Sequence, residues 1–279
     1  MNVLNRIARG SRDMTQGTPW KAILAFSLPL LAGNLLQQLY NTVDSIVVGR
    51  YVGREALAAV GTSFPAMMLM FALFMGIATG TNIMVAQYFG AKDKESLSKT
   101  VHTALSLTAI VGVFISVAGY FFVPTLLKWI QVPDNVFEMT RTYLQIIFLG
   151  HIASLYYNIL SGILRGLGDS ITPLIFLMIS TAINITLDLV FVIALDMGVA
   201  GVALATIIAQ SCSAIFGFFR IRQMNGILQI HLRELRPDRK LALQMVRLGI
   251  PAGIQQSTFS IANLLVQSLI NSFGDVIMA

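Results

Sequence analysis

The chain has 279 residues, of which 56% are hydrophobic and only 11% are charged, and its mean hydropathy is +0.74. Soluble domains carry about 25% charged residues, so this composition excludes an ordinary soluble domain and indicates an integral membrane protein. The net charge of +6 does not indicate nucleic-acid binding, because the basic residues stand between apolar runs. The single cysteine, Cys212, excludes a disulfide within the chain and a cysteine-based metal site.

Apolar runs of about 20 residues or more, the length needed to cross a bilayer, predict six complete spans. They cover 21–48, 60–86, 100–127, 140–163, 172–195 and 199–220, and a seventh span starts near residue 243. We expect the spans to be helical, because lipid offers the backbone no hydrogen-bond partners. The predicted fold class is an all-α polytopic membrane protein: a six-helix transmembrane lobe followed by the first helix of a second lobe.

The Lys and Arg residues around the spans predict the orientation of the chain. Fifteen of them lie before or at the start of the first span, or in the connections after spans two, four and six, and four lie in the other connections. The positive-inside rule therefore puts the N-terminus in the cytoplasm. We expect 1–18 to be a cytoplasmic segment, 19–220 to be the first transmembrane lobe and 221–242 to be a basic cytoplasmic loop between two lobes.

The seventh span resembles the first in its pattern. The segment "SLPLLAGNLLQQLYNTVDSIVVGRYVG" can be set beside "RLGIPAGIQQSTFSIANLLVQSLINSFG", with Pro29 opposite Pro251 and Asn41 opposite Asn263. Parallel repeats of six spans are a known plan of transporters. The similarity predicts that 243–279 opens a second lobe, and that the chain is a truncated form of a protein with about twelve spans.

Two acidic residues, Asp44 and Asp188, lie well inside predicted spans. A charged Asp at the centre of a membrane helix costs about 2.5–3.5 kcal/mol on insertion scales, so it usually faces a protein interior and has a function. The alternative for an isolated acid is a structural residue that neighbouring helices satisfy.

Each acid ends a line of polar residues at helical spacing. The first line consists of Asn34, Gln37 or Gln38, Asn41 and Asp44, and Tyr40 lies four residues before the acid. The second line consists of Ser180, Asn184 and Asp188. Hydrogen bonding between helices could explain one such face, but two faces that each hold an acid predict a shared cavity.

Asp44, Asp188 and Thr206 lie at similar depth in the outer halves of their spans, so the three side chains can meet. Two carboxylates close together in a medium of low dielectric constant resist being charged at the same time. We therefore expect the pair of acids to hold either a proton or a cation, such as Na⁺. This chemistry is typical of ion-coupled transporters.

Five segments, in order, resemble the multidrug and toxic compound extrusion (MATE) family. They are "PLLAGNLLQQLYNTVDSIVVGRYVG", "VAQYFGAKD", "ILRGLGDSITP", "INITLDLVFV" and "GVAGVALATIIAQ". The resemblance implies a two-lobe, twelve-helix antiporter of the plasma membrane, which exports small cationic or amphipathic drugs in exchange for H⁺ or Na⁺. It implies a monomer surrounded by the lipid bilayer, with no enzymatic activity, no cofactor and no nucleic-acid partner.

The resemblance also implies roles for particular residues. The ion-coupling site of the family corresponds to Asp44, Asn184, Asp188 and Thr206. Gln37, Tyr40 and Asn158 match family positions that line the substrate cavity, and Asn41 joins them from the polar line. Pro29 matches the proline at which the first helix of some members bends when the acid is protonated.

The seventh span departs from the pattern of those family members that carry an acid there. This chain has amides instead, at Gln255, Gln256, Asn263 and Gln267. The coupling of drug export to the ion is therefore expected to depend on the acids of the first lobe.

Two other functions share features with this sequence. A flippase for lipids or lipid-linked oligosaccharides shares the architecture of this superfamily, but it would need Arg or Lys inside the cavity, where this chain has acids. The segment "GLGD", Gly166 to Asp169, matches the signature of intramembrane aspartyl proteases. Such a protease needs this Asp deep in a span, whereas we expect Asp169 in a cytoplasmic turn. Exposure of Asp169 to solvent would exclude this function.

Overall fold

The computed structural model describes residues 18–224 and 236–271. The predicted N-terminal segment up to residue 17, half of the predicted loop between the lobes and the end of the seventh span lie outside these ranges. The described residues form seven α-helices, which are α2 (Pro19–Val47), α3 (Arg54–Gly90), α4 (Lys94–Trp129), α5 (Asp134–Gly166), α6 (Ile171–Leu189), α7 (Gly198–Gln223) and α8 (Arg239–Asn271). Two π-helical segments extend them: η1 (Val48–Val52) continues α2, and η2 (Val190–Ala194) continues α6.

Five helical stretches within the described residues are long and apolar enough to cross a membrane. They are Pro19–Val52, Lys94–Trp129, Asp134–Gly166, Ile171–Ala194 and Gly198–Gln223. The prediction of an all-α protein with several membrane spans is therefore confirmed. The helices α3, with 37 residues, and α8, with 33 residues, are not in this set, so the division into six spans plus one stays a prediction.

The helices extend beyond the predicted spans at several ends. The helix α3 begins at Arg54 instead of residue 60, α7 continues to Gln223 instead of residue 220, and α8 begins at Arg239 instead of residue 243. The reason is that hydropathy marks only the part of a helix that suits lipid, whereas backbone hydrogen bonds continue to a capping residue. At α4 that residue is Asp93, whose carboxylate accepts a hydrogen bond from the Ser96 backbone N–H at 3.0 Å.

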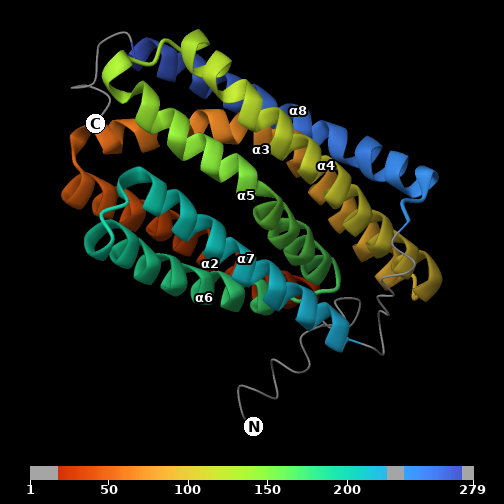
Figure 1. Ribbon diagram of the computed structural model, residues 1–279. Coiled ribbons are helices and arrows are strands. Elements are labelled where there is room, and N and C mark those ends of the chain that lie inside the picture. Colours follow the sequence, from red (N-terminus) through yellow and green to blue (C-terminus); the bar gives the residue numbers. More distant parts are fainter. Residues whose placement is uncertain (1–17, 225–235, 272–279) are drawn as a thin grey trace.

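Figure 1 shows α5 between two groups of helices, with α3, α4 and α8 on one side and α2, α6 and α7 on the other. The central helix α5 packs against α3, α4 and α7. Large apolar side chains on the outer faces of the bundle are exposed, including Phe114 and Phe121 of α4 and Phe219 of α7. Such surfaces suit contact with lipid, since exposed apolar area of this extent would be unfavourable in water.

The helix α8, which opens the predicted second lobe, packs along α3 with a close approach of the two backbones. A Cβ atom added at Gly76 would lie 2.9 Å from the carbonyl oxygen of Gly249, and one added at Gly80 would overlap the backbone of Met245. Glycines at a helix crossing let backbones approach in this way. The crossing therefore depends on the absence of side chains at these positions.

Candidate functional site

Three helices bring the predicted ion-coupling residues together inside the lobe. The helix α2 carries Asp44, α6 carries Asn184 and Asp188 one turn apart on the same face, and α7 carries Thr206. The side chains of Asp44, Asn184 and Asp188 are buried, and Thr206 is half-buried. Asp44, Asn184 and Asp188 come together through the Asn184 amide, and Thr206 joins them through the Tyr40 hydroxyl. The role of these residues in ion coupling stays a prediction.

The amide of Asn184 lies between the two acids. With its oxygen and nitrogen assigned from the surrounding partners, the amide nitrogen donates to Asp44 Oδ1 at 2.8 Å and to Asp188 Oδ2 at 3.3 Å. The amide oxygen faces the Tyr40 hydroxyl at 3.2 Å. One neutral amide thus bridges both carboxyl groups without adding charge to the site.

The two carboxyl groups lie close to each other, because the single Asn184 amide nitrogen contacts one oxygen of each. Two carboxyl groups at such short range resist being charged at the same time. Asp188 Oδ1 is buried and has no hydrogen-bond partner among the described residues. Because a buried oxygen without a partner is unfavourable, this atom is suited to accept a proton or to coordinate a cation.

Two tyrosines border the acids. The Tyr40 hydroxyl lies 3.3 Å from Thr206 Oγ1, so its single hydrogen can be donated either to Thr206 or to the Asn184 oxygen. Tyr143 of α5 is buried close enough to interact electrostatically with both Asp44 and Asp188. The sequence reasoning missed Tyr143, because it stands in a span without a regular line of polar residues.

The π-helical segments follow the two acids directly. The segment η1 begins four residues after Asp44, η2 begins two residues after Asp188, and the two segments contact each other. Short π-helical turns are rare and are frequently found at functional sites. Hydrophobic periodicity could not predict them, since one extra residue in a turn scarcely changes the pattern over a whole span.

The predicted cavity residues differ in how far they are buried, although those of α2 lie on one polar line. In α2, Tyr40 is buried and Gln37 and Asn41 are half-buried, whereas Asn34 and Gln38 are exposed. The Asn158 amide donates to the Ser154 carbonyl oxygen of its own helix at 2.8 Å.

Pro29 lies inside α2, fifteen residues before Asp44, which corresponds to roughly 22 Å along a helix. The predicted hinge therefore does not touch the acids directly. The roles of the cavity residues and of this proline stay predictions.

Asp169 is buried, so the solvent exposure that would exclude a protease is not found. This residue stands in the turn between α5 and α6, as predicted, but its side chain is 1% exposed. Its carboxylate accepts hydrogen bonds from the backbone N–H and the hydroxyl of Thr172, at 2.9 and 2.6 Å, and lies 3.7 Å from Arg220 Nη2. Burial follows because the acid caps the start of α6 and pairs with the end of α7.

A helical bundle with several membrane spans and a buried pair of acids defines the class of a polytopic membrane transport protein. The MatE family model matches residues 29–190, which is more than half of the chain. The chain belongs to the MATE family, whose members are membrane transporters. The recognition made from the sequence motifs is confirmed.

Named relatives and solved structures are similar to this chain in sequence and in fold. It is 33% identical to the probable multidrug resistance protein YoeA of Bacillus subtilis (strain 168), over 91% of this chain and 57% of that protein. A multidrug resistance MATE family transporter of the MOP superfamily has been solved in two conformations. The inward-facing one has a TM-score of 0.80 at 30% identity, over 87% of this chain and 55% of that one. The outward-facing one has a TM-score of 0.81 at 32% identity, over 88% and 55%. The chain spans a little over half the length of these relatives.

Proposed function

We propose that this chain forms the first lobe and the opening of the second lobe of a secondary active multidrug exporter. The exporter moves small organic cations outward in exchange for H⁺ or Na⁺. The observation that carries the proposal is the buried arrangement of Asp44, Asn184 and Asp188, in which one carboxylate oxygen has no partner among the described residues. The multidrug function of the related proteins supports the choice of substrate.

The coupling follows from the charge of the site. When neither acid is neutralised, the buried site is negative and attracts an organic cation into the adjacent cavity. When a proton or Na⁺ binds between Asp44 and Asp188, this charge falls and the drug loses its electrostatic hold. The Tyr40 hydroxyl contacts the Asn184 amide that bridges the acids, and the Thr206 hydroxyl contacts Tyr40. These oxygen atoms suit a hard cation, which prefers oxygen ligands.

Alternating access then exposes the site to either side of the membrane in turn. The described lobe is similarly close to the inward-facing and the outward-facing structures of a family member, with TM-scores of 0.80 and 0.81. This similarity supports a mechanism in which each lobe moves nearly as a rigid body against the other. The half-buried residues Gln37, Asn41 and Asn158 line the path of the drug, and Pro29 provides the hinge of α2.

The proposed setting is the plasma membrane, with the N-terminus in the cytoplasm and the protein as a monomer. In this setting, α2 to α7 are the six spans of the first lobe and α8 is the seventh span. The basic residues near the α3–α4 and α5–α6 turns and at the end of α7 lie at one end of the bundle, which the positive-inside rule assigns to the cytoplasm.

A flippase is less favoured. Such a protein would need basic residues in its cavity to hold anionic head groups. The buried polar site has two carboxyl groups instead, and its described neighbours are an amide and hydroxyl groups.

The test is export of ethidium, a permanent organic cation, from cells that express the full-length transporter containing this chain. We expect Asp44→Asn and Asp188→Asn each to lower export about 5–150-fold, the range of typical coupling free energies. The matched control is Asp196→Asn, because Asp196 is exposed in the turn between η2 and α7. Its backbone φ of 49° is also tolerated by Asn.

Undiminished export in both variants, at equal expression, would refute the mechanism. The coupling ion is identified in the same assay by varying sodium at fixed pH. Export that follows the sodium gradient identifies Na⁺, and export that follows only the pH gradient identifies H⁺.

A further inference from the structure

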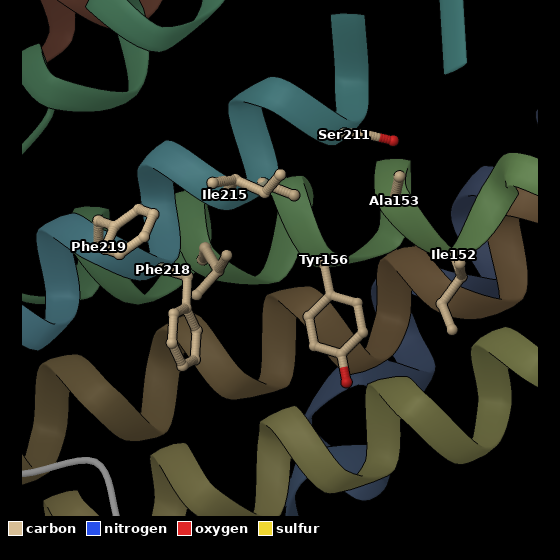
Figure 2. Close-up of a pocket in the computed structure, with 9 residues that line it drawn as sticks. Ile152, Ala153, Tyr156, Ser211, Ile215, Phe218 and Phe219 are labelled. Atoms are coloured by element: carbon tan, nitrogen blue, oxygen red, sulfur yellow. The ribbon is translucent and has the colours of Figure 1, made fainter. Parts of the chain in front are cut away.

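A groove of about 440 Å³ lies between α5 and α7, away from the acids. Figure 2 shows its two sides, with Ile152, Ala153 and Tyr156 on α5 and with Ser211, Ile215 and the two phenylalanines 218 and 219 on α7. This volume lies within the range of about 300–1,000 Å³ that is usual for small-molecule sites. The groove is therefore large enough to hold a small molecule or an acyl chain.

The lining of the groove favours hydrocarbon. None of its nine lining residues is charged, so no ion pair holds an organic cation there. Its two hydroxyl groups already donate to the protein: Tyr156 donates to the Leu105 carbonyl oxygen at 3.2 Å, and Ser211 donates to the Ile207 carbonyl oxygen at 2.7 Å. A ligand in the groove consequently gains apolar contact and finds no free donor.

The length and direction of the groove match one leaflet of a membrane. Along α7 it runs from Ser211 to Phe219, which is about 12 Å of helix. One leaflet supplies about half of the hydrocarbon thickness of about 30 Å, and that half is about 15 Å. The groove thus runs from near the middle of the bilayer to the end of the bundle where α7 stops.

A positive charge stands at that end of the groove. Arg222 follows Ile215 by seven residues and Phe218 by four, so it lies on the same face of α7 as these lining residues. Its side chain is exposed and forms no salt bridge with any residue in 18–224 or 236–271. By contrast, the nearby Arg220 pairs with Asp169. Arg222 is therefore available to an anion at the membrane surface.

We propose that this groove binds one anionic phospholipid, with an acyl chain between α5 and α7 and the phosphate on Arg222. The occupant is a lipid because the groove is apolar and of leaflet length, and it is anionic because the charge at the head-group level is positive. The site is separate from the acid pair and does not depend on the proposed export.

The test is native mass spectrometry of the purified chain, titrated with phosphatidylglycerol and phosphatidylethanolamine that carry identical acyl chains. We expect phosphatidylglycerol to bind more tightly. Arg222→Gln should weaken its binding about fivefold, toward that of phosphatidylethanolamine, the effect typical of one basic residue at a membrane surface. The matched control is Arg50→Gln, since Arg50 is exposed at the opposite end of the bundle.

A second variant tests the groove itself. Ala214→Phe fills it and should remove binding of both lipids, while Ala182→Phe, at an exposed position of α6, should leave binding unchanged. In the unmodified chain, phosphatidylglycerol with a diazirine on its acyl chain should crosslink to peptides that contain 152–160 and 211–219. This mapping does not depend on the folding of any variant.

Three results would overturn the proposal. The first is equal phosphatidylglycerol affinity in the Arg222→Gln variant and the unmodified chain. The second is crosslinking spread evenly over all helices, which would indicate ordinary bilayer contact. The third is displacement of the lipid by ethidium, which would make the groove a drug site.

Discussion

The close crossing of α3 and α8 makes a sharp prediction about a single methyl group. Gly80→Ala places a Cβ atom against the backbone of Met245, 2.8 Å from its carbonyl carbon, and in closer contact with its carbonyl oxygen. Carbon atoms pack best at about 3.5–4.0 Å. A backbone group cannot turn away as a side chain can, so the two helices must separate by about 1 Å.

The expected loss of stability follows from two opposing effects. Replacing a helical glycine by alanine favours folding by about 0.5–1 kcal/mol, because alanine loses less backbone freedom. Forcing an extra methyl group into a packed crossing typically costs about 1–3 kcal/mol. The packing cost is the larger effect, so the variant should lose about 1–2 kcal/mol. For a chain of this size, that corresponds to a melting temperature lower by roughly 2–8 °C.

The assay is thermal unfolding of the purified chain in detergent, followed by size-exclusion chromatography with fluorescence detection. The matched control is Gly162→Ala, since Gly162 is also buried in a helix but its Cβ would lie 3.6 Å from the Ala78 carbonyl oxygen, an ordinary contact. This control should melt at or above the temperature of the unmodified chain. If Gly80→Ala melts as high as Gly162→Ala, the close crossing of α3 and α8 does not exist in solution.

Contacts of three further residues can be tested by the same melting assay. Tyr40→Phe removes a buried hydroxyl group that forms a hydrogen bond between helices, and it should lower the free energy of unfolding by about 1 kcal/mol. The control Tyr51→Phe, at an exposed side chain, should cause no measurable loss. Equal losses in the two variants would contradict the hydrogen bond of Tyr40. Asp169→Ala should lower the free energy of unfolding by about 2–3 kcal/mol, because it removes the cap of α6 and the ion pair with Arg220. Asp169→Asn should cost less, because the Asn amide oxygen can still accept hydrogen bonds. A larger loss for Asp169→Asn than for Asp169→Ala would refute the role of these contacts. Hydrogen bonds from the Ser96 side chain and backbone lower the pKa of Asp93, so its stabilisation is present above the unfolded pKa of about 3.9 and is lost as pH falls through the lower folded value. The difference between the unmodified chain and Asp93→Ala should therefore shrink below pH of about 4, and a constant difference from pH 7 to 3 would argue against it.

The closeness of Asp44 and Asp188 could be anticipated from the sequence for a specific reason. A helix in a membrane has a known rise per residue, so the distance of each polar residue from the end of its span sets its depth. Polar residues at equal depth on neighbouring helices can meet, because lipid does not satisfy them. Depth and face are properties of single helices and can be read without knowing how the helices pack.

Other parts of the site depend on contacts that no single helix contains. Tyr143 interacts electrostatically with the acids only because α5 lies between the two groups of helices. Asp169 is buried only because the end of α7 comes beside the turn before α6. The exposure of Asn34 and Gln38 also differs from that of Tyr40 and Asp44, although all four lie on one predicted stripe. Neighbouring helices cover only part of that stripe.

The sequence by itself determined the class of the protein, the approximate extent of its helices, the residues of the acid pair and the family, since hydropathy, helical spacing and motifs are local properties. Only the tertiary structure decided that Asn184 bridges the two acids, that one oxygen of Asp188 lacks a partner among the described residues, that α8 approaches α3 through glycines, and that an apolar groove opens between α5 and α7. These features arise where segments distant in the chain come into contact. Their geometry depends on distances of a few tenths of an ångström, which side-chain packing sets and residue order does not.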